Sequence, residues 1–179
     1  GNYLDAGRVF EQHLQLLLMN AVGWWILALL LVVSYPKSAK FWSKNPLLQL
    51  LFAFSTLIPF IAGVLRLRLE HYTNDPYHGL FLLLYVFVLV WAADSGAYFS
   101  GRAFGKRKLA PKVSPGKSWE GVVGGLITAL VLAFVFIHFS GDALVGERNI
   151  TGFVILSVAT VAISVLGDLT ESMFKRESG

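Results

Sequence analysis

An aspartate interrupts one of the long apolar runs of this sequence. Asp94 lies within Trp91–Tyr98 (WAADSGAY), at a depth where the neighbouring residues are apolar. A carboxylate inside a membrane costs at least about 2.5 kcal/mol, so Asp94 needs a cation, a metal ion or a water-filled cavity. The alternative is that a Lys or Arg neutralises Asp94 for folding alone. Ala97, Gly101 and Gly105 follow at four-residue spacing, which predicts close approach of another helix or of a ligand.

A strongly basic loop at residues 102–118 is the second feature that could do chemistry. Its Gly116–Ser118 segment (GKS) is similar to the end of a phosphate-binding loop. Pro111 stands where that motif needs its first glycine, and no strand is expected before it, so an ATPase loop is excluded. Ammonium groups beside the N–H groups of a helix start still predict an anion site, for a polyphosphate or a lipid phosphate. The simpler interpretation is a loop that only sets topology, which would leave its two prolines and the adjacent Glu120 unexplained.

The third feature lies near the C-terminal end of the chain. Asp168, Glu171 and Ser172 are spaced three and four residues apart, so on a helix we expect them to share one face, with Lys175 one turn further on. Oxygen ligands followed by cations suit a Mg²⁺ ion that holds phosphates. The alternative is an ordinary solvated helix end.

The elements that must position these residues are membrane helices. Apolar residues make up 55% of the 179 residues and charged residues only 15%, whereas about 25% is usual in soluble domains. A helix needs about 20 apolar residues to cross a bilayer. The fold class predicted is an all-α, polytopic integral membrane bundle forming a single domain over residues 1–179, with five helices at about 16–34, 47–65, 79–101, 119–139 and 150–176.

The distribution of charge predicts how the chain is oriented. Eleven of the 15 Lys and Arg residues fall after the first, third and fifth helices, and four fall on the other side. By the positive-inside rule the basic loop and the C-terminus face the cytoplasm, and the N-terminus lies outside. The net charge of +4 occurs in short clusters between apolar runs, which favours a lipid bilayer as partner and speaks against nucleic acid. With no cysteine, disulfides and thiolate metal sites are excluded.

The two ends of the sequence suggest a fragment. The chain begins at Gly1 without a methionine, and its polar first fifteen residues are expected to form a linker into the first helix rather than a signal peptide. It stops at Gly179, directly after a charged stretch.

Taken together, these segments resemble the phosphatidate cytidylyltransferases (CDP-diacylglycerol synthases) of bacterial inner membranes. The resemblance covers essentially the whole chain from the first helix onward. It is carried by Asp94–Tyr98 (DSGAY), Gly101–Lys108 (GRAFGKRK), Leu109–Gly121 (LAPKVSPGKSWEG) and Gly167–Arg176 (GDLTESMFKR). The last segment is similar to the beginning of the family's sequence pattern, a Ser followed three and four positions later by Lys-Arg.

The resemblance implies an enzyme that transfers CMP from CTP to phosphatidate, releasing pyrophosphate and forming CDP-diacylglycerol for phospholipid synthesis. It implies Mg²⁺ dependence and a site at the cytoplasmic surface of the bacterial inner membrane, and it leaves a homodimer open. Carried over by position, Asp168 would bind metal, with Glu171 assisting, and Asp168, Lys117 and Lys175 would be catalytic. Substrate or phosphate binding would fall to Asp94, Lys112, Ser114, Lys117, Ser172, Lys175 and Arg176.

The sequence departs from the family pattern at its end. In the family, Lys-Arg is followed by a Lys-Asp pair, a Pro-Gly-His-Gly-Gly stretch and further Asp residues, and this chain stops before them. We therefore expect residues 1–179 alone to be inactive. Two other functions are alternatives: an ion-coupled transporter that uses Asp94 and Asp168 within the membrane, and a polyprenol or lipid kinase with a similar basic loop.

Overall fold

Five long helices dominate the computed structural model, which describes residues 2–140 and 150–178. They are α1 (Asn2–Val33), α3 (Pro46–Arg68), α4 (His78–Phe104), α5 (Trp119–Ser140) and α7 (Ile150–Ser178). Each is long and apolar enough to cross a membrane. The prediction of a polytopic helical membrane protein is confirmed.

The first helix begins earlier than expected. α1 starts at Asn2, where we expected a linker leading to a helix at residue 16. The stretch apolar enough to span begins at Gln12, so the preceding polar residues extend the helix beyond that stretch. Polar residues can form a helix wherever water can solvate their side chains, and hydropathy therefore marks the span and not the helix end.

The basic loop contains a small β-hairpin, which is not apparent from its sequence. β1 (Lys108–Ala110) pairs antiparallel with β2 (Ser114–Ser118), with Lys108 opposite Ser118, Ala110 opposite Ser114 and an irregularity between them. The strands are too short and too rich in Lys, Gly and Pro to show an alternating pattern. Pro115 is tolerated because a two-stranded ribbon has only edge strands. Within residues 2–140 and 150–178, the otherwise helical bundle thus carries this one hairpin, which α5 follows directly.

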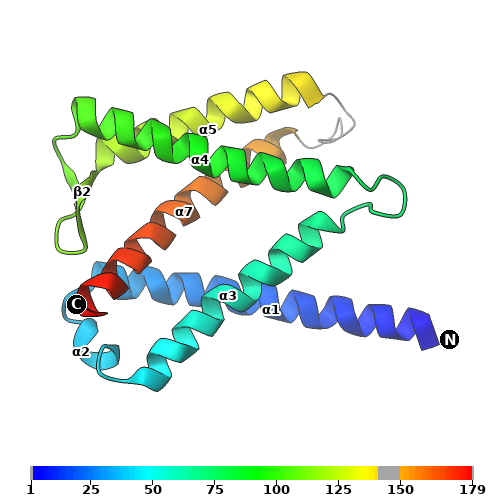
Figure 1. Ribbon diagram of the computed structural model, residues 1–179, viewed down its shortest axis with the longest axis horizontal. Coiled ribbons are helices and arrows are strands. Elements are labelled where there is room, and N and C mark those ends of the chain that lie inside the picture. Colours follow the sequence, from blue (N-terminus) through cyan, green and yellow to red (C-terminus); the bar gives the residue numbers. More distant parts are fainter. Residues whose placement is uncertain (1, 141–149, 179) are drawn as a thin grey trace.

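The helices form two groups that α7 connects. Figure 1 shows α4 and α5 running side by side, with α7 passing from them towards α1 and α3. Small residues let α4 and α5 pack closely: a Cβ at Gly121 would lie 2.9 Å from the backbone oxygen of Ala97, and one at Gly125 would lie 3.0 Å from that of Ala93. Membrane helices commonly associate through such small residues, because lipid is as apolar as their side chains and close van der Waals packing must hold them together.

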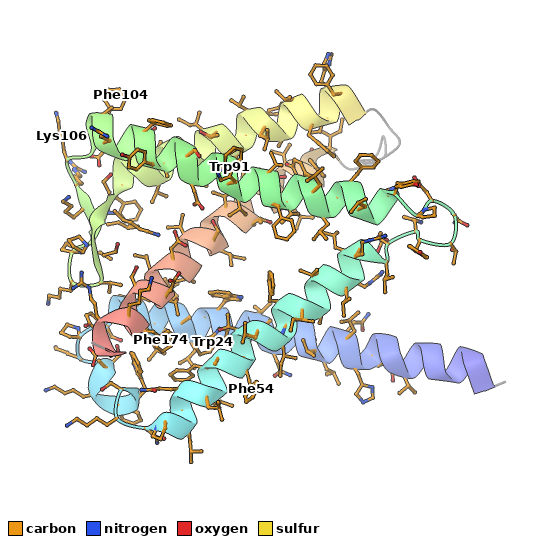
Figure 2. The ribbon with its side chains drawn as sticks, viewed as in Figure 1. Trp24, Phe54, Trp91, Phe104, Lys106 and Phe174 are labelled. Atoms are coloured by element: carbon orange, nitrogen blue, oxygen red, sulfur yellow. The ribbon has the colours of Figure 1, made fainter. Side chains whose placement is uncertain are left out.

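Two clusters of buried residues hold the groups together. One joins α4, α5 and α7 around Tyr85, whose hydroxyl lies 2.7 Å from Ser157 Oγ. The other joins α1, the short helix α2 (Ala39–Trp42), α3, the hairpin and α7, and contains Trp24, Trp42, Phe52, Val113 and Met173. Figure 2 shows Trp24 and Phe174 where these elements meet. The second cluster fixes the hairpin against the last turns of α7.

The connections that the structure describes fall at two opposite ends of the molecule. The α2 segment, the hairpin and the C-terminus gather at one end, and the N-terminus and the connection between α3 and α4 lie at the other (Figure 1). The three most basic segments therefore share one end, as the alternation of charge requires for five spans.

Candidate functional site

A cavity of about 450 Å³ opens between α4, α5, α7 and the hairpin. It combines carboxylates, cations and small residues from all four elements. Its lining comprises Asp94, Ala97, Tyr98, Gly101, Arg102, Gly116, Lys117, Ser118, Gly121, Val122, Val165 and Asp168. The three polar features singled out from the sequence each contribute to this one space.

An ion pair crosses the cavity between the hairpin and α7. Lys117 Nζ lies 2.7 Å from Asp168 Oδ2, joining residues 51 positions apart in the chain. The side chain of Asp168 is 50% exposed and that of Lys117 is 27% exposed. The exposed Asp168 carboxylate is a potential metal ligand, and the Lys117 ammonium group is a potential phosphate ligand. The ion pair therefore brings the two kinds of group together in one cavity.

The C-terminal part of α4 supplies a row of polar side chains to the same cavity. Asp94, Tyr98 and Arg102 are spaced four residues apart and so lie on one face of the helix. The guanidinium of Arg102 donates to the Tyr98 hydroxyl at 3.0 Å. Tyr98 and Arg102 were not among the predicted site residues, although their spacing from Asp94 could have indicated them.

Ser118 and two glycines bring the hairpin, α4 and α5 into contact. The Ser118 hydroxyl, buried in the structure, accepts a hydrogen bond from the Gly121 N–H at 3.1 Å and so caps the start of α5. A Cβ at Gly101 would lie 3.2 Å from Ser118 Oγ, and one at Gly105 would lie 2.9 Å from it. The close approach predicted from the spacing of these glycines therefore occurs. Gly101, Ser118 and Gly121 also form part of the cavity wall.

A second, smaller cavity of about 260 Å³ holds a further group of predicted residues. Two hydroxyls and two cations line it, together with the turn of the hairpin: Val113, Ser114, Pro115, Ser172, Lys175 and Arg176. Arg176 Nε donates to the backbone oxygen of Val113, which anchors the last turn of α7 to the hairpin. Hydroxyl donors beside ammonium and guanidinium groups suit a phosphate.

Glu171 does not join Asp168. Its carboxylate pairs with Lys175 Nζ at 3.0 Å, and it lines a third cavity, of about 520 Å³, among residues of α1, α2 and α3. Positions three and four residues along a helix are rotated by about −60° and +40° from the first, so Glu171 and Ser172 are themselves about 100° apart. Asp168, Glu171 and Ser172, which we expected to share one face, therefore line three different cavities.

Lys112 is the remaining predicted residue. It lies in the turn between β1 and β2, with its side chain exposed. It lines neither of the two polar cavities.

The carboxylates that line the cavity of about 450 Å³ could take part in binding a hard cation. Among residues 2–140 and 150–178, no three His, Asp or Glu side chains are grouped as a metal site would require. Asp94 and Asp168 nevertheless line one cavity. Mg²⁺ is commonly held by one or two carboxylates together with substrate phosphates, and this donor set fits that pattern.

Comparison with known proteins agrees with this chemistry. A profile described as "Cytidylyltransferase family" matches residues 1–179. The chain belongs to the cytidylyltransferase family. Curated relatives include the phosphatidate cytidylyltransferases of Haemophilus influenzae, 92% identical over 179 residues (100% of this chain and 62% of that protein), and of Pseudomonas aeruginosa, 44% identical over 179 residues (90% and 56%). The relative from Bacillus subtilis is 40% identical over 126 residues (69% and 44%).

The family assignment confirms the resemblance seen in the sequence. The chain spans about three fifths of the length of the Haemophilus and Pseudomonas relatives. No solved structure matches it.

Proposed function

We propose that the full-length protein transfers CMP from CTP to phosphatidate, producing CDP-diacylglycerol and pyrophosphate. The observation that carries the proposal is the 2.7 Å approach of Lys117 to Asp168 in a cavity that Asp94 and Arg102 also line. That cavity offers both cations and carboxylates at one end of a membrane bundle. The names of the bacterial relatives support the same pair of substrates.

The proposed reaction must overcome repulsion between two phosphate groups. An oxygen of the phosphatidate phosphate attacks the α-phosphorus of CTP, and the bond from that phosphorus to the oxygen bridging to the β-phosphate breaks, so that pyrophosphate leaves. The attacking phosphate is already ionised at neutral pH and needs no general base. Such transfers depend mainly on positioning and on cations that neutralise developing charge.

Lysine and arginine side chains of the protein supply much of the positive charge that the reaction needs. In this proposal, Lys117 and Arg102 hold phosphate oxygens in the cavity of about 450 Å³ that they line. Lys175 and Arg176 hold a phosphate group in the smaller cavity of about 260 Å³. Lys117 and Ser114 belong to the same strand, three residues apart, so about 10 Å of β2 connects the two cavities. An extended triphosphate and its acceptor could therefore contact both.

We propose Mg²⁺ as the cofactor, held by Asp168 and Asp94. When bound, it would supply positive charge to the phosphates of CTP. Asp94 replaces Glu171 in this proposal, because Glu171 lines a different cavity and pairs with Lys175.

The proposed location is the bacterial inner membrane, with the cavity on the cytoplasmic side and the N-terminus of this chain outside. The gathering of the basic segments at one end of the bundle supports this orientation (Figure 1). The acyl chains of phosphatidate could then remain in the bilayer while the phosphate reaches the cavity. A homodimer remains a prediction from the sequence.

The decisive test is to assay the purified full-length protein with radiolabelled CTP and phosphatidate, with and without Mg²⁺. We expect lipid-linked CMP with Mg²⁺, and no product when EDTA removes the metal. Asp168→Asn should abolish turnover while circular dichroism shows that the protein remains folded. Normal turnover in that variant would remove Asp168 from the mechanism. Phosphorylation of a lipid with ATP, or solute flux in liposomes without CTP, would instead support one of the rival functions.

A further inference from the structure

The base of the hairpin is attached to the first turn of α5 by Glu120. Both carboxylate oxygens of Glu120 accept a hydrogen bond from the backbone N–H of Arg107, at 3.2 Å each. The backbone N–H of Trp119 donates to the carbonyl oxygen of Arg107 at 2.9 Å. Both backbone polar groups of Arg107 are therefore bonded to the first two residues of α5.

The hairpin itself has little to define its register. Its strands pair at two positions, with an irregularity between them. Such a short ladder specifies its own pairing weakly, so contacts with other elements, such as those of the buried Val113 and Ser118, help to fix the hairpin. A contact outside the ladder that fixes the strand entering the hairpin therefore matters more here than in a long sheet.

Lys117 depends on that register. It belongs to β2, one residue before Ser118, the partner of Lys108, and its ammonium group must reach Asp168 on α7. A slip of one residue would turn the Lys117 side chain to the opposite side of the ribbon. Figure 2 shows Phe104 and Lys106 at the end of α4, where the chain enters the hairpin just before the residue that Glu120 holds.

We propose that Glu120 is a positioning residue, whose carboxylate fixes the base of the hairpin on α5 and so places Lys117 opposite Asp168. Glu120 is outside the set of residues that line the two polar cavities, so it acts through the hairpin and not on the reacting atoms. The proposal rests on the proposed function only where it concerns catalysis. Its structural part can be tested separately.

The structural test measures the position of the hairpin by spin labelling. Lys108→Cys and Phe41→Cys place labels on β1 and on α2, at two exposed side chains, in the full-length protein with any other cysteine replaced. We expect a narrow distance distribution for the parent, a broad or shifted one for Glu120→Met, and recovery with Glu120→Gln, which retains an acceptor oxygen. An unchanged distribution in Glu120→Met would overturn the proposal.

A measurement on the unmutated protein covers the case in which Glu120→Met does not fold. Hydrogen exchange followed by mass spectrometry should show that the Arg107 amide is protected relative to its exposed neighbours. Exchange at the rate of an unprotected amide would also overturn the proposal.

The kinetic test separates positioning from a general effect of charge. We expect Glu120→Met to lower kcat for CTP about tenfold or more with a smaller change in KM, and Glu120→Gln to recover most of the loss although it removes the charge. The matched control is Glu70→Met, because Glu70 lies just after α3 at the other end of the bundle and pairs with its near neighbours Arg66 and His71. Equal activity of Glu120→Met and the parent would contradict the proposal, and so would a Gln variant as poor as the Met variant. Absence of CTP turnover in the parent would count against the proposed function alone, since the spin-label and exchange results do not depend on it.

Discussion

At the scale of single residues, the cavity places a cation where it can act on phosphates while also neutralising a carboxylate. Lys117 and Asp168 offset each other's charge across the gap between β2 and α7. Partly exposed pairs contribute little to stability, typically about 0–1 kcal/mol. Their importance is therefore expected in substrate binding and not in folding.

Replacing Lys117 tests this expectation. Lys117→Met keeps the length of the side chain and removes its charge, so kcat/KM for CTP should fall about a hundredfold, as when one preorganised donor to a transition state is lost. The melting temperature should change little. Lys108→Met is the matched control, since Lys108 lies on the neighbouring strand with an exposed side chain and does not line the cavity. Equal losses in the two variants would show that only the overall charge of the loop matters.

At the scale of elements, the position of Asp94 depends on how closely α4 and α5 pack. Glycines on α5 face backbone oxygens of α4, so the distance between the helices is set by backbone contact. α7 then crosses this pair and brings Asp168 to the cavity from a separate segment. The site is therefore sensitive to substitutions that touch none of its charged groups.

Gly121→Ala tests the contact between these helices. The added Cβ would lie 2.9 Å from the Ala97 backbone oxygen. Because this oxygen belongs to the backbone, the clash can be relieved only if one of the helices shifts. We expect a loss of stability of about 1–3 kcal/mol, with reduced CTP turnover. Gly63→Ala is the control: it is also a glycine inside a helix, but a Cβ there meets no atom within 4 Å, so the change should be neutral or stabilising by up to about 1 kcal/mol. Thermal unfolding in detergent measures both, and equal melting temperatures would contradict this account of the packing.

At the scale of the whole molecule, the basic segments share one end because five spans place alternate connections on the same side. The buried cluster around Trp42, Val113 and Met173 then joins three of these segments into one structure. The hairpin is thus supported from α5 at its base and from α2 and α7 nearer its turn.

Accessibility labelling tests the orientation of the molecule in the membrane. In a cysteine-free full-length protein, Lys40→Cys and Lys106→Cys should react with a membrane-impermeant maleimide only after the inner membrane is permeabilised. Asn74→Cys, in the connection between α3 and α4, should react with intact spheroplasts. The reverse pattern would place the cavity outside the cytoplasm and would be incompatible with CTP as substrate.

The sequence alone determined the membrane class, the five spans and the grouping of basic segments, because apolar runs and loop charges act through the bilayer and need no knowledge of tertiary contacts. It also singled out Asp94, Lys117 and Asp168, since charged groups within or beside membrane-spanning segments require partners. Only the tertiary structure decided that Asp168 faces Lys117 while Glu171 turns away, because cavity boundaries around a helix depend on which neighbours pack there. The hairpin and the contact of Glu120 with Arg107 were likewise beyond the sequence, since short polar strands are stabilised by contacts with α5, α2 and α7 and not by their own pattern.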